Sequence, residues 1–440
     1  MVVAGSLIRN LPIPKLSPKA IDPMTMTSRP MIRLVCRLAV MLLTLVAVSL
    51  PARAQSEAEF RQFLQSLWPE AQAMGISRRT FDEATRDLKL NLSLPDLVIP
   101  GKPKQAPRGQ AEFERTPEQY LSEASLSRLT AQGQKLAAEH KATLAAIEKR
   151  FGLPPSVVLA IWGRETNYGN VKLPYNTIEV LAAQAYIGRR KDMFRRELLL
   201  AMKILEERHV TYKDMKASWA GAMGHTQFLP TDFLKYAVDQ DGDGHRDIWN
   251  SVPDSLGSAA SQLLAKGWDR GKRWGFEVKL PANVDCSTAE PDTKMTVAEW
   301  IKRGYLPLTH KPTREELAED ASLFLPAGLN GPAFLTLKNF YVFKGYNFAD
   351  LYALFVGHLA DRIAGGKNFA TRWGKIEQAR SDHIEAIQRH LTKAGFYSDK
   401  IDGKAGMKTR AALGAWQKST GLPLDCWPSR ALAERMQAVR

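Results

Sequence analysis

Residues 151–170 read FGLPPSVVLAIWGRETNYGN, and this stretch predicts the helix around which the fold is built. Pro154 and Pro155 mark its start, because proline fits the first turn of a helix. The run from Val157 to Trp162 is wholly apolar, so the helix must be buried on every side. Glu165 comes shortly after that run. The sequence therefore places one carboxylate at the C-terminal end of a core helix.

This position determines what Glu165 can do. Burial and the negative end of the helix dipole both disfavour a carboxylate, so we expect the pKa of Glu165 to be raised. A carboxylic acid that is still protonated near neutral pH is what cleavage of a glycosidic bond requires. In the alternative interpretation, Glu165 pairs with Arg164 or Arg195 and only caps the helix. The residues alone leave both interpretations open.

Helical periodicity extends over most of the chain on either side. Residues 57–150 have apolar residues at helical spacing, interrupted by a proline-rich stretch at 95–107, and the pattern continues through 181–210. Between 275 and 326 it weakens, and alternating pieces such as FEVKLP predict a small strand-bearing insertion. A last long helix, FADLYALFVGHLADRIAGG, ends at Gly365-Gly366. The fold class is therefore mainly α, with a minor β part (α+β).

A separate compact unit is predicted at the C-terminus, over residues 381–440, after a short polar linker at 373–380. It contains two related halves, each with a helix that carries apolar residues and a Gln, followed by a Gly-containing turn. Because about 60 residues fold alone only marginally, we expect three short helices that share one core.

The N-terminal 54 residues differ from the rest. Two arginines precede an apolar run at 38–50, and Ala52-Arg53-Ala54 follows, which predicts a cleaved secretory signal. Met31 would be a start that gives this signal its ordinary length. A run of 13 residues is too short to span a bilayer comfortably, which disfavours a membrane anchor as the alternative. We therefore expect an exported, periplasmic protein.

Cleavage after Ala54 would leave 54 Lys and Arg against 45 Asp and Glu, a net charge of +9. A basic surface attracts polyanions, but export excludes nucleic acid as a partner and favours the carboxylates of the cell wall; the alternative is that the charge serves only solubility. Of the three cysteines, Cys36 lies within the signal, and Cys286 and Cys426 either pair or stay free. The sequence leaves that question, and any protein partner, open.

A second segment with chemical potential is SWAGAMGHTQFLP, residues 218–230. Small residues surround a lone Gln227, whose side chain offers both a donor and an acceptor to an amide or hydroxyl group. Small residues also let the backbone approach a bulky ligand. The pattern is typical of a sugar site, although a Gly- and Ala-rich loop is also a common packing feature.

Taken together, three segments carry a family resemblance. GRETNYGN, AGAMGHTQFLP, and NFYVFKGYN with LYALFVGHLADRIAGG occur in this order within residues 55–372. They resemble the catalytic and groove segments of the lytic murein transglycosylase B family. The resemblance implies a catalytic domain over 55–372 with a lysozyme-like, mainly helical core that contains the small insertion.

The resemblance also implies roles for single residues. Glu165 would be the catalytic acid/base, Gln227 would line the glycan groove, and Tyr341, Tyr346 and Asn347 would contact sugar. Aromatic rings suit the apolar faces of sugars, although tyrosines at these positions also serve as ordinary core residues.

The reaction implied by the resemblance is cleavage of the MurNAc–GlcNAc bond of peptidoglycan with formation of a 1,6-anhydro ring, and it requires no cofactor. A hydrolase with two carboxyl groups needs a second acid at a fixed separation, and the catalytic segment has only one convincing carboxylate. The alternatives are a lysozyme-type hydrolase and a non-catalytic wall-binding protein.

Residues 239–247, DQDGDGHRD, resemble the start of an EF-hand loop. The carboxylates of Asp239, Asp241 and Asp243 occupy the first ligand positions, and His245 follows. The usual late glutamate is replaced by Asn250, and relatives of the implied family suggest that Asp254 takes its part. The prediction is a structural calcium site, and the alternative is a surface loop held by its own Asx turns.

Residues 384–436 resemble the small three-helix peptidoglycan-binding domain of wall enzymes, through Gln388, Ile401-Asp402-Gly403, Thr409-Arg410 and Gln417. Its second Asp-Gly turn appears as Asp425-Cys426, which is atypical. The implied role is to hold the enzyme on peptidoglycan glycan strands; the alternative is a stability module without a ligand.

Overall fold

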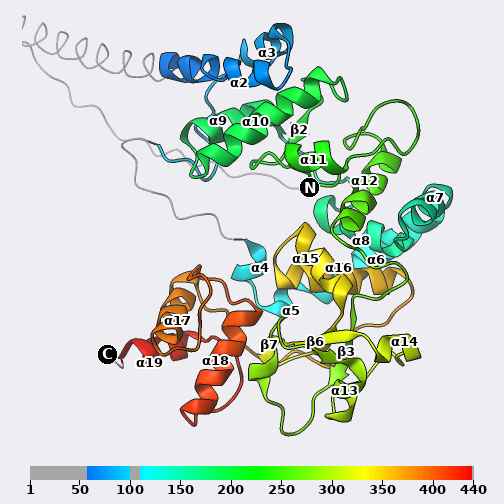
Figure 1. The fold of residues 1–440 in the computed structure, drawn as a ribbon, viewed down its shortest axis with the longest axis vertical. Coiled ribbons are helices and arrows are strands. Elements are labelled where there is room, and N and C mark those ends of the chain that lie inside the picture. Colours follow the sequence, from blue (N-terminus) through cyan, green and yellow to red (C-terminus); the bar gives the residue numbers. More distant parts are fainter. Residues whose placement is uncertain (1–56, 100–109, 439–440) are drawn as a thin grey trace, which may run out of the picture. The chain divides into compact units, whose positions relative to one another are not determined.

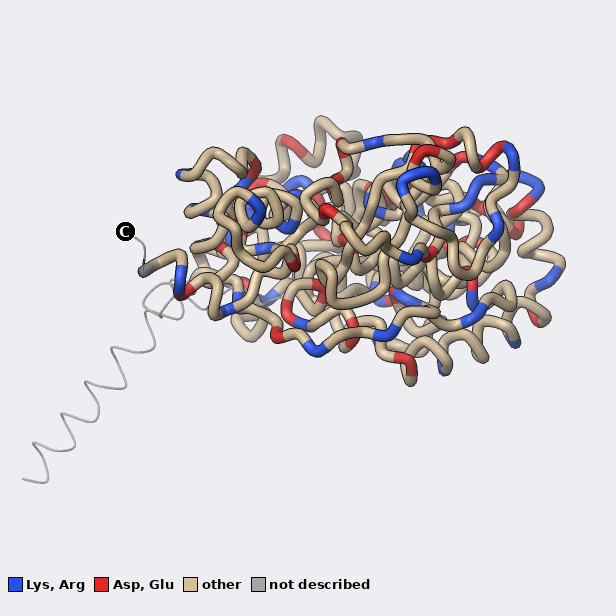
Figure 2. The backbone as a smooth tube through the Cα atoms, turned by 90° about the horizontal axis from the view of Figure 1, so that it is seen from below, with Lys and Arg blue, Asp and Glu red and all other residues tan. Residues whose placement is uncertain are grey.

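The computed structural model describes residues 57–99 and 110–438, and the described residues from Phe60 onward belong to one compact unit (Figure 1). The predicted signal at 1–54, with Met31 and Cys36, lies outside the described residues. Within the described ranges, the helices are too short or too polar to span a bilayer. Positive and negative residues are interspersed along the chain (Figure 2).

The predicted core helix is present as α8 (Pro155–Thr166), with Pro155 in its first turn. Val158, Leu159 and Ile161 are fully buried, so no side of this helix faces water over that run. The helix ends where Asn167 and Tyr168 both adopt left-handed backbone angles. The packing partners of α8 are α6 (Glu123–Glu139), α7 (Lys141–Phe151), α12 (Val252–Ala265) and α16 (Asp350–Ile363).

A second helical layer packs around its own core, which includes Phe81, Phe194 and Leu198. The helicity expected over 181–210 is interrupted at Gly188, because the amide of Val98 donates to the carbonyl of Ile187 and Leu97 pairs with Gly188. The helices of this layer are α2 (Trp68–Ala73), α3 (Arg78–Thr85), α9 (Thr177–Ile187), α10 (Lys191–Glu206) and α11 (Pro230–Tyr236), and β1 (Tyr175–Asn176) and β2 (Lys216–Ala217) form a short pair beside them.

The predicted insertion is an antiparallel sheet in the order β4-β6-β8-β3-β5. The sheet extends beyond residue 326, where the sequence predicts the insertion to end. The central strand β8 is buried along its whole length, so its sequence lacks the apolar–polar alternation that would have indicated a strand. The elements are β3 (Gly275–Lys279), η1 (Cys286–Thr288), β4 (Met295–Thr296), α13 (Val297–Lys302), β5 (Leu306–Pro307), α14 (Arg314–Leu317), β6 (Asp320–Phe324), β7 (Pro326–Leu329) and β8 (Ala333–Thr336). Three further helices pack with the core around α8 and α16, and they are α4 (Ala111–Glu114), α5 (Pro117–Tyr120) and α15 (Lys338–Tyr346).

The C-terminal module has the three expected helices, α17 (Ser381–Lys393), α18 (Met407–Ser419) and α19 (Arg430–Ala438). Its two halves repeat one device, a buried glutamine whose side-chain oxygen accepts the backbone amides of the following turn. Gln388 accepts from Asp402 and Gly403, and Gln417 accepts from Asp425 and Cys426. The atypical Asp425-Cys426 turn is therefore held in the same way as its regular counterpart.

Cys286 and Cys426 are joined in a disulfide with their Cα atoms 6.2 Å apart. This bond answers the question that the sequence leaves open, and it links the strand-bearing insertion to the module. Lys418 adds an ion pair to Asp285 at 2.6 Å beside it.

Candidate active site

Glu165 lies in the last turn of α8 and faces α16. The hydroxyl of Tyr352 donates a hydrogen bond of 2.5 Å to its Oε1 atom. Burial raises the pKa of Glu165 to about 7, although this hydrogen bond and the positive charge of Arg164 act in the opposite direction. The rise expected from the sequence is therefore present, and desolvation is its main cause.

Neither arginine considered from the sequence forms an ion pair with Glu165. Arg195 binds Glu70 at 2.6 Å, within the second helical layer. Arg164 turns away from its neighbour and binds Glu112 at 3.2 Å and the hydroxyl of Tyr120. The capping interpretation is thus not the one that the geometry supports.

Arg164 nevertheless influences the site through its surroundings. Its guanidinium lies over the rings of Tyr120, Phe355 and Tyr352, at 4.8, 5.1 and 5.9 Å from their centroids. Its positive charge lowers the pKa of Glu165, and the negative charge of Glu112 raises it again. The cluster behind Glu165 therefore contains one charge of each sign.

The loop at 218–230 is attached directly to the end of α8. The hydroxyl of Thr166 donates to the carbonyl of His225 at 3.0 Å. Gly224 has a left-handed backbone, and a Cβ atom there would lie 2.4 Å from the carbonyl oxygen of Ile248. Gln227 also has a left-handed backbone, and its side-chain amide donates to the carbonyls of Gly224 and Ala222. The small residues allow the tight turn that the backbone makes here.

The predicted sugar contacts have different surroundings in the structure. Tyr346 belongs to the site, because its ring stacks on Tyr352 at 6.3 Å and its hydroxyl donates to the carbonyl of Thr226. Asn347 follows α15 and accepts a hydrogen bond from the amide of Ala349, before α16 begins. The hydroxyl of Tyr341 lies 3.4 Å from that of Thr336, on strand β8. Tyr341 therefore faces the sheet.

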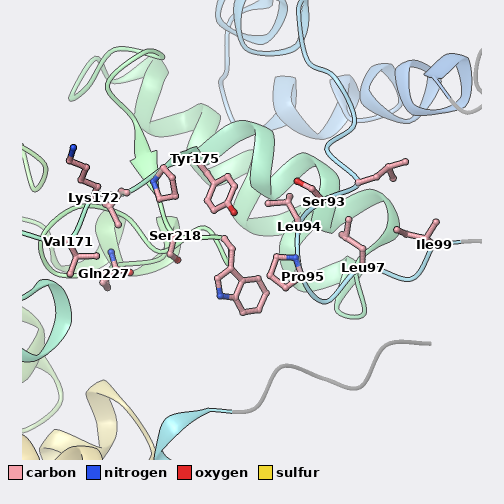
Figure 3. Close-up of a pocket in the computed structure, with 14 residues that line it drawn as sticks. Ser93, Leu94, Pro95, Leu97, Ile99, Val171, Lys172, Tyr175, Ser218 and Gln227 are labelled. Atoms are coloured by element: carbon pink, nitrogen blue, oxygen red, sulfur yellow. The ribbon is translucent and has the colours of Figure 1, made fainter. Parts of the chain in front are cut away.

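A pocket of about 660 Å³ begins at this loop. It runs from Gln227 and Ser218 along Val171–Tyr175 to the loop Leu92–Ile99 (Figure 3). The backbone amide of Val171 donates to the carbonyl of Thr166, so the pocket opens next to the end of the helix that carries Glu165.

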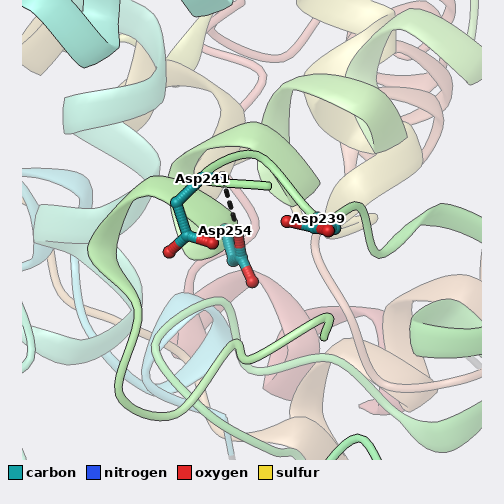
Figure 4. Close-up of side chains that lie close together, drawn as sticks. All are labelled: Asp239, Asp241 and Asp254. Atoms are coloured by element: carbon teal, nitrogen blue, oxygen red, sulfur yellow. Dashed lines mark hydrogen bonds between the residues drawn. The ribbon is translucent and has the colours of Figure 1, made fainter. Parts of the chain in front are cut away.

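The EF-hand-like loop brings together only part of its predicted ligand set. Carboxylate oxygens of Asp239, Asp241 and Asp254 lie within 4.8 Å of one another (Figure 4). Asp254 is fully buried, and both burial and the negative charge of Asp241 raise its pKa. Like charges gathered around a buried carboxylate suit a hard cation. Asp243 and His245 instead line a separate hollow of about 580 Å³.

Comparisons with known proteins agree with this geometry. The model of the transglycosylase SLT domain family matches residues 59–361, and that of the peptidoglycan binding domain family matches residues 380–436. The chain belongs to the transglycosylase SLT family. It is 31% identical over 218 residues to membrane-bound lytic murein transglycosylase B of Escherichia coli, a match that covers 49% of this chain and 58% of that protein.

Two solved structures extend the match. SltB3 from Pseudomonas aeruginosa, in complex with NAG-NAM-pentapeptide, is 39% identical with a TM-score of 0.75, and the match covers 86% of this chain and 99% of that one. SltB1 from the same organism is 28% identical with a TM-score of 0.56, over 70% and 98% of the two chains. The predicted family, the lysozyme-like helical fold and the wall-binding module are thus confirmed.

Sequence reasoning missed the residues that surround Glu165. Tyr352 lies 187 positions away along the chain, inside a helix that otherwise appears as ordinary core. Glu112 and Tyr120 belong to two short helices without a motif of their own. Tyr352 lies in the family-like segment LYALFVGHLADRIAGG, where it is the one residue with a hydroxyl group, but the sequence does not show that this hydroxyl reaches Glu165.

Proposed function

We propose that this protein is a lytic transglycosylase that cleaves the MurNAc–GlcNAc bond of peptidoglycan and leaves 1,6-anhydro-MurNAc ends. Glu165 acts first as the acid and then as the base. The observation that carries the proposal is a partly buried glutamate whose pKa is raised to about 7, which accepts a hydrogen bond from Tyr352 at the end of the core helix that the loop at 218–230 contacts.

The chemistry follows from that pKa. Protonated Glu165 donates its proton to the bridging oxygen as the bond from MurNAc C1 to that oxygen breaks, and GlcNAc leaves with a free hydroxyl. The resulting carboxylate removes the proton from the C6 hydroxyl of the same MurNAc, and O6 bonds to C1. Glu165 is protonated again, so one group completes the cycle, and no water is consumed.

Tyr352 supports the second half of this cycle. A hydroxyl that donates to the carboxylate stabilises its charged form and holds it in one orientation. Tyr346 stacks on Tyr352 and donates to the carbonyl of Thr226, one residue before Gln227, and we assign Tyr346 and Gln227 to the border of the sugar beside the scissile bond. For Tyr341 and Asn347 a sugar contact has less support, because their polar groups serve the sheet and the turn.

A lysozyme-type hydrolase is the main rival. It uses a second carboxyl group about 5 to 9.5 Å from the first. Glu112 is a second carboxylate near Glu165, but Arg164 and Tyr120 both bind it. This engagement favours the reaction with one carboxylate.

The proposed activity also suggests a role for each region of the chain. We propose that residues 1–54 direct export to the periplasm and that the domain at 55–372 performs catalysis. After the linker at 373–380, the module at 381–440 holds the enzyme on glycan strands. The disulfide supports an oxidising location, since such bonds persist there.

We further propose a structural calcium site made by Asp239, Asp241 and Asp254. Calcium would offset two of the three negative charges of these carboxylates and brace the loop that precedes α12. Titration of chelator-treated protein with calcium, followed by calorimetry, should show binding and a raised Tm. Absence of heat at millimolar calcium would eliminate the site.

The reaction itself is tested by mass spectrometry of the products released from purified sacculi. Anhydro-MurNAc ends are expected. Reducing MurNAc ends would identify a hydrolase, and intact glycan would leave only a wall-binding protein.

A further inference from the structure

One buried carboxylate joins the C-terminal module to the catalytic domain. Asp350 is the first residue of α16 and is 8% exposed. From the module, the backbone amide of Met407 donates to its Oδ2 atom at 3.0 Å, and Arg410 donates to the same oxygen at 3.2 Å. From α15, Lys344 donates to its Oδ1 atom at 2.6 Å. Asp350 therefore ties the starts of α16 and α18 to the last part of α15.

The two catalytic-domain helices that meet at Asp350 also carry the tyrosines beside Glu165. Tyr352 follows Asp350 by two residues in α16, and its hydroxyl donates to Glu165. Tyr346 follows Lys344 by two residues in α15, and its ring stacks on that of Tyr352 with an angle of 9° between the rings. A change at Asp350 would therefore reach both tyrosines within one helical turn.

This contact belongs to a larger interface between the module and the catalytic domain. The side chain of Met407 is 3% exposed and is part of the same buried core as α8 and α16. The amide of Leu329 donates to the carbonyl of Asp425 at 2.9 Å, and Cys426, the next residue, is joined to Cys286. Domains move relative to each other unless their interface is large and apolar. A module that completes the core of its neighbour is not free to move in this way.

We propose that the module is a structural part of the active site and that Arg410 is a positioning residue for the proposed reaction, on which this inference rests. Arg410 fixes Asp350 at the start of α16, and this helix holds the hydroxyl of Tyr352 against Glu165. Without the guanidinium, the buried carboxylate of Asp350 loses a cationic partner, and the first turn of α16 must move to bring it water or another donor. A displacement of about 1 Å near a catalytic group can lower a rate about 10²-fold.

A short soluble substrate separates positioning from wall binding. A tetrasaccharide of alternating GlcNAc and MurNAc needs no anchoring on sacculi, so a module that only tethers the enzyme does not affect its turnover. Wild type, Arg410→Met and Arg410→Lys are assayed on it after thermal unfolding has shown that each is folded. Arg410→Gln replaces Arg410→Met if the latter is unfolded at the assay temperature. Lys418→Met is the matched control, because it removes a 2.6 Å ion pair between the same helix and Asp285 without touching Asp350.

We expect Arg410→Met to lower kcat on the tetrasaccharide about tenfold and to leave KM within about twofold, because the sugar contacts stay in place while the acid is misaligned. Arg410→Lys, which keeps a cation beside Asp350, should regain most of the loss. Lys418→Met should stay within about twofold of wild type. An unchanged kcat in Arg410→Met would overturn the proposal, and so would an equal loss in Lys418→Met.

A double variant tests whether Arg410 acts through Tyr352. Misalignment weakens the hydrogen bond from Tyr352, so the basic limb of the pH–rate profile should move to higher pH in Arg410→Met, as in Tyr352→Phe. Once Tyr352→Phe has removed that bond, the addition of Arg410→Met should lower kcat by less than about twofold. Losses that multiply would indicate general destabilisation and overturn the proposal.

A measurement without substrate separates this inference from the proposed reaction. The pKa of the Glu165 carboxyl group is followed by ¹³C NMR in the same variants. We expect a higher pKa in Arg410→Met than in wild type, an unchanged pKa in Lys418→Met, and no further rise when Arg410→Met is added to Tyr352→Phe. This result would support the positioning role even if wild type released no anhydro product. An unchanged pKa in Arg410→Met, or a rise that persists without the Tyr352 hydroxyl, would overturn it.

Discussion

Two carboxylates near the start of α16 have pKa values shifted in opposite directions, Glu165, which is partly buried, and Asp350, which is buried. Glu165 has the hydroxyl of Tyr352 as its hydrogen-bond donor, and burial raises its pKa to about 7. Asp350 lies two residues before Tyr352, and Lys344, Arg410 and the amide of Met407 hold its pKa below the ordinary value. Burial alone therefore does not raise the pKa of a carboxyl group. Cationic partners stabilise the carboxylate of Asp350 and lower its pKa, whereas Glu165 has no such ion pair.

The largest expected effect is the loss of activity in Glu165→Gln. An amide cannot deliver or accept the proton, so we expect activity on sacculi to fall by about 10³-fold or more. Binding to sacculi, measured by co-sedimentation, should stay unchanged. Activity within tenfold of wild type would remove Glu165 from this role.

The same substitution should stabilise the fold, with a dependence on pH. The pKa of Glu165 is raised in the folded state, so ionisation above the unfolded value of 4.5 costs stability, and this cost grows until the pH passes about 7. Urea unfolding of Glu165→Gln should therefore show a gain of about 2 to 3 kcal/mol at pH 8 and little gain at pH 4. A gain that does not change with pH would contradict the raised pKa.

The opposite sign is expected at Asp350. Arg410→Met removes one of its two cationic partners, so we expect a loss of about 2 kcal/mol at pH 7 in urea unfolding. Because the pKa of Asp350 is lowered in the folded state, this loss should shrink once the pH falls below the lowered value. If the loss did not shrink as the pH is lowered, the ion pair would not be its cause.

The smallest expected effects are shifts of the pH–rate profile in two variants, Tyr352→Phe and Glu112→Gln. Both shifts concern the basic limb, where activity falls because Glu165 loses its proton, and they have opposite directions. Tyr352→Phe removes a donor that lowers the pKa of Glu165, so the limb should move to higher pH, with a rate loss of about tenfold. Glu112→Gln removes a negative charge that raises this pKa, so the limb should move to lower pH. Shifts in the same direction would refute the assigned electrostatics.

The contrast also shows what the sequence can predict. The apolar run of α8 was enough to predict that Glu165 lies at the end of a core helix and that its pKa is raised, because that run is a local pattern. Tyr352 and the partners of Asp350 come from distant segments, which only the fold brings together. The same holds for the disulfide, whose cysteines are 140 positions apart. The position of Asp254 beside Asp239 and Asp241 was predictable by analogy with an EF-hand loop. Asp243 and His245 were predicted to join them, but they line a separate hollow.

The central claim is that Glu165 is the buried proton donor. Its most direct test is the titration of the Glu165 carboxyl carbon by NMR, with ¹³C-labelled glutamate and Glu165→Gln used to assign the signal. The account predicts a pKa of about 7. A value at or below the ordinary glutamate value of 4.5 would contradict it.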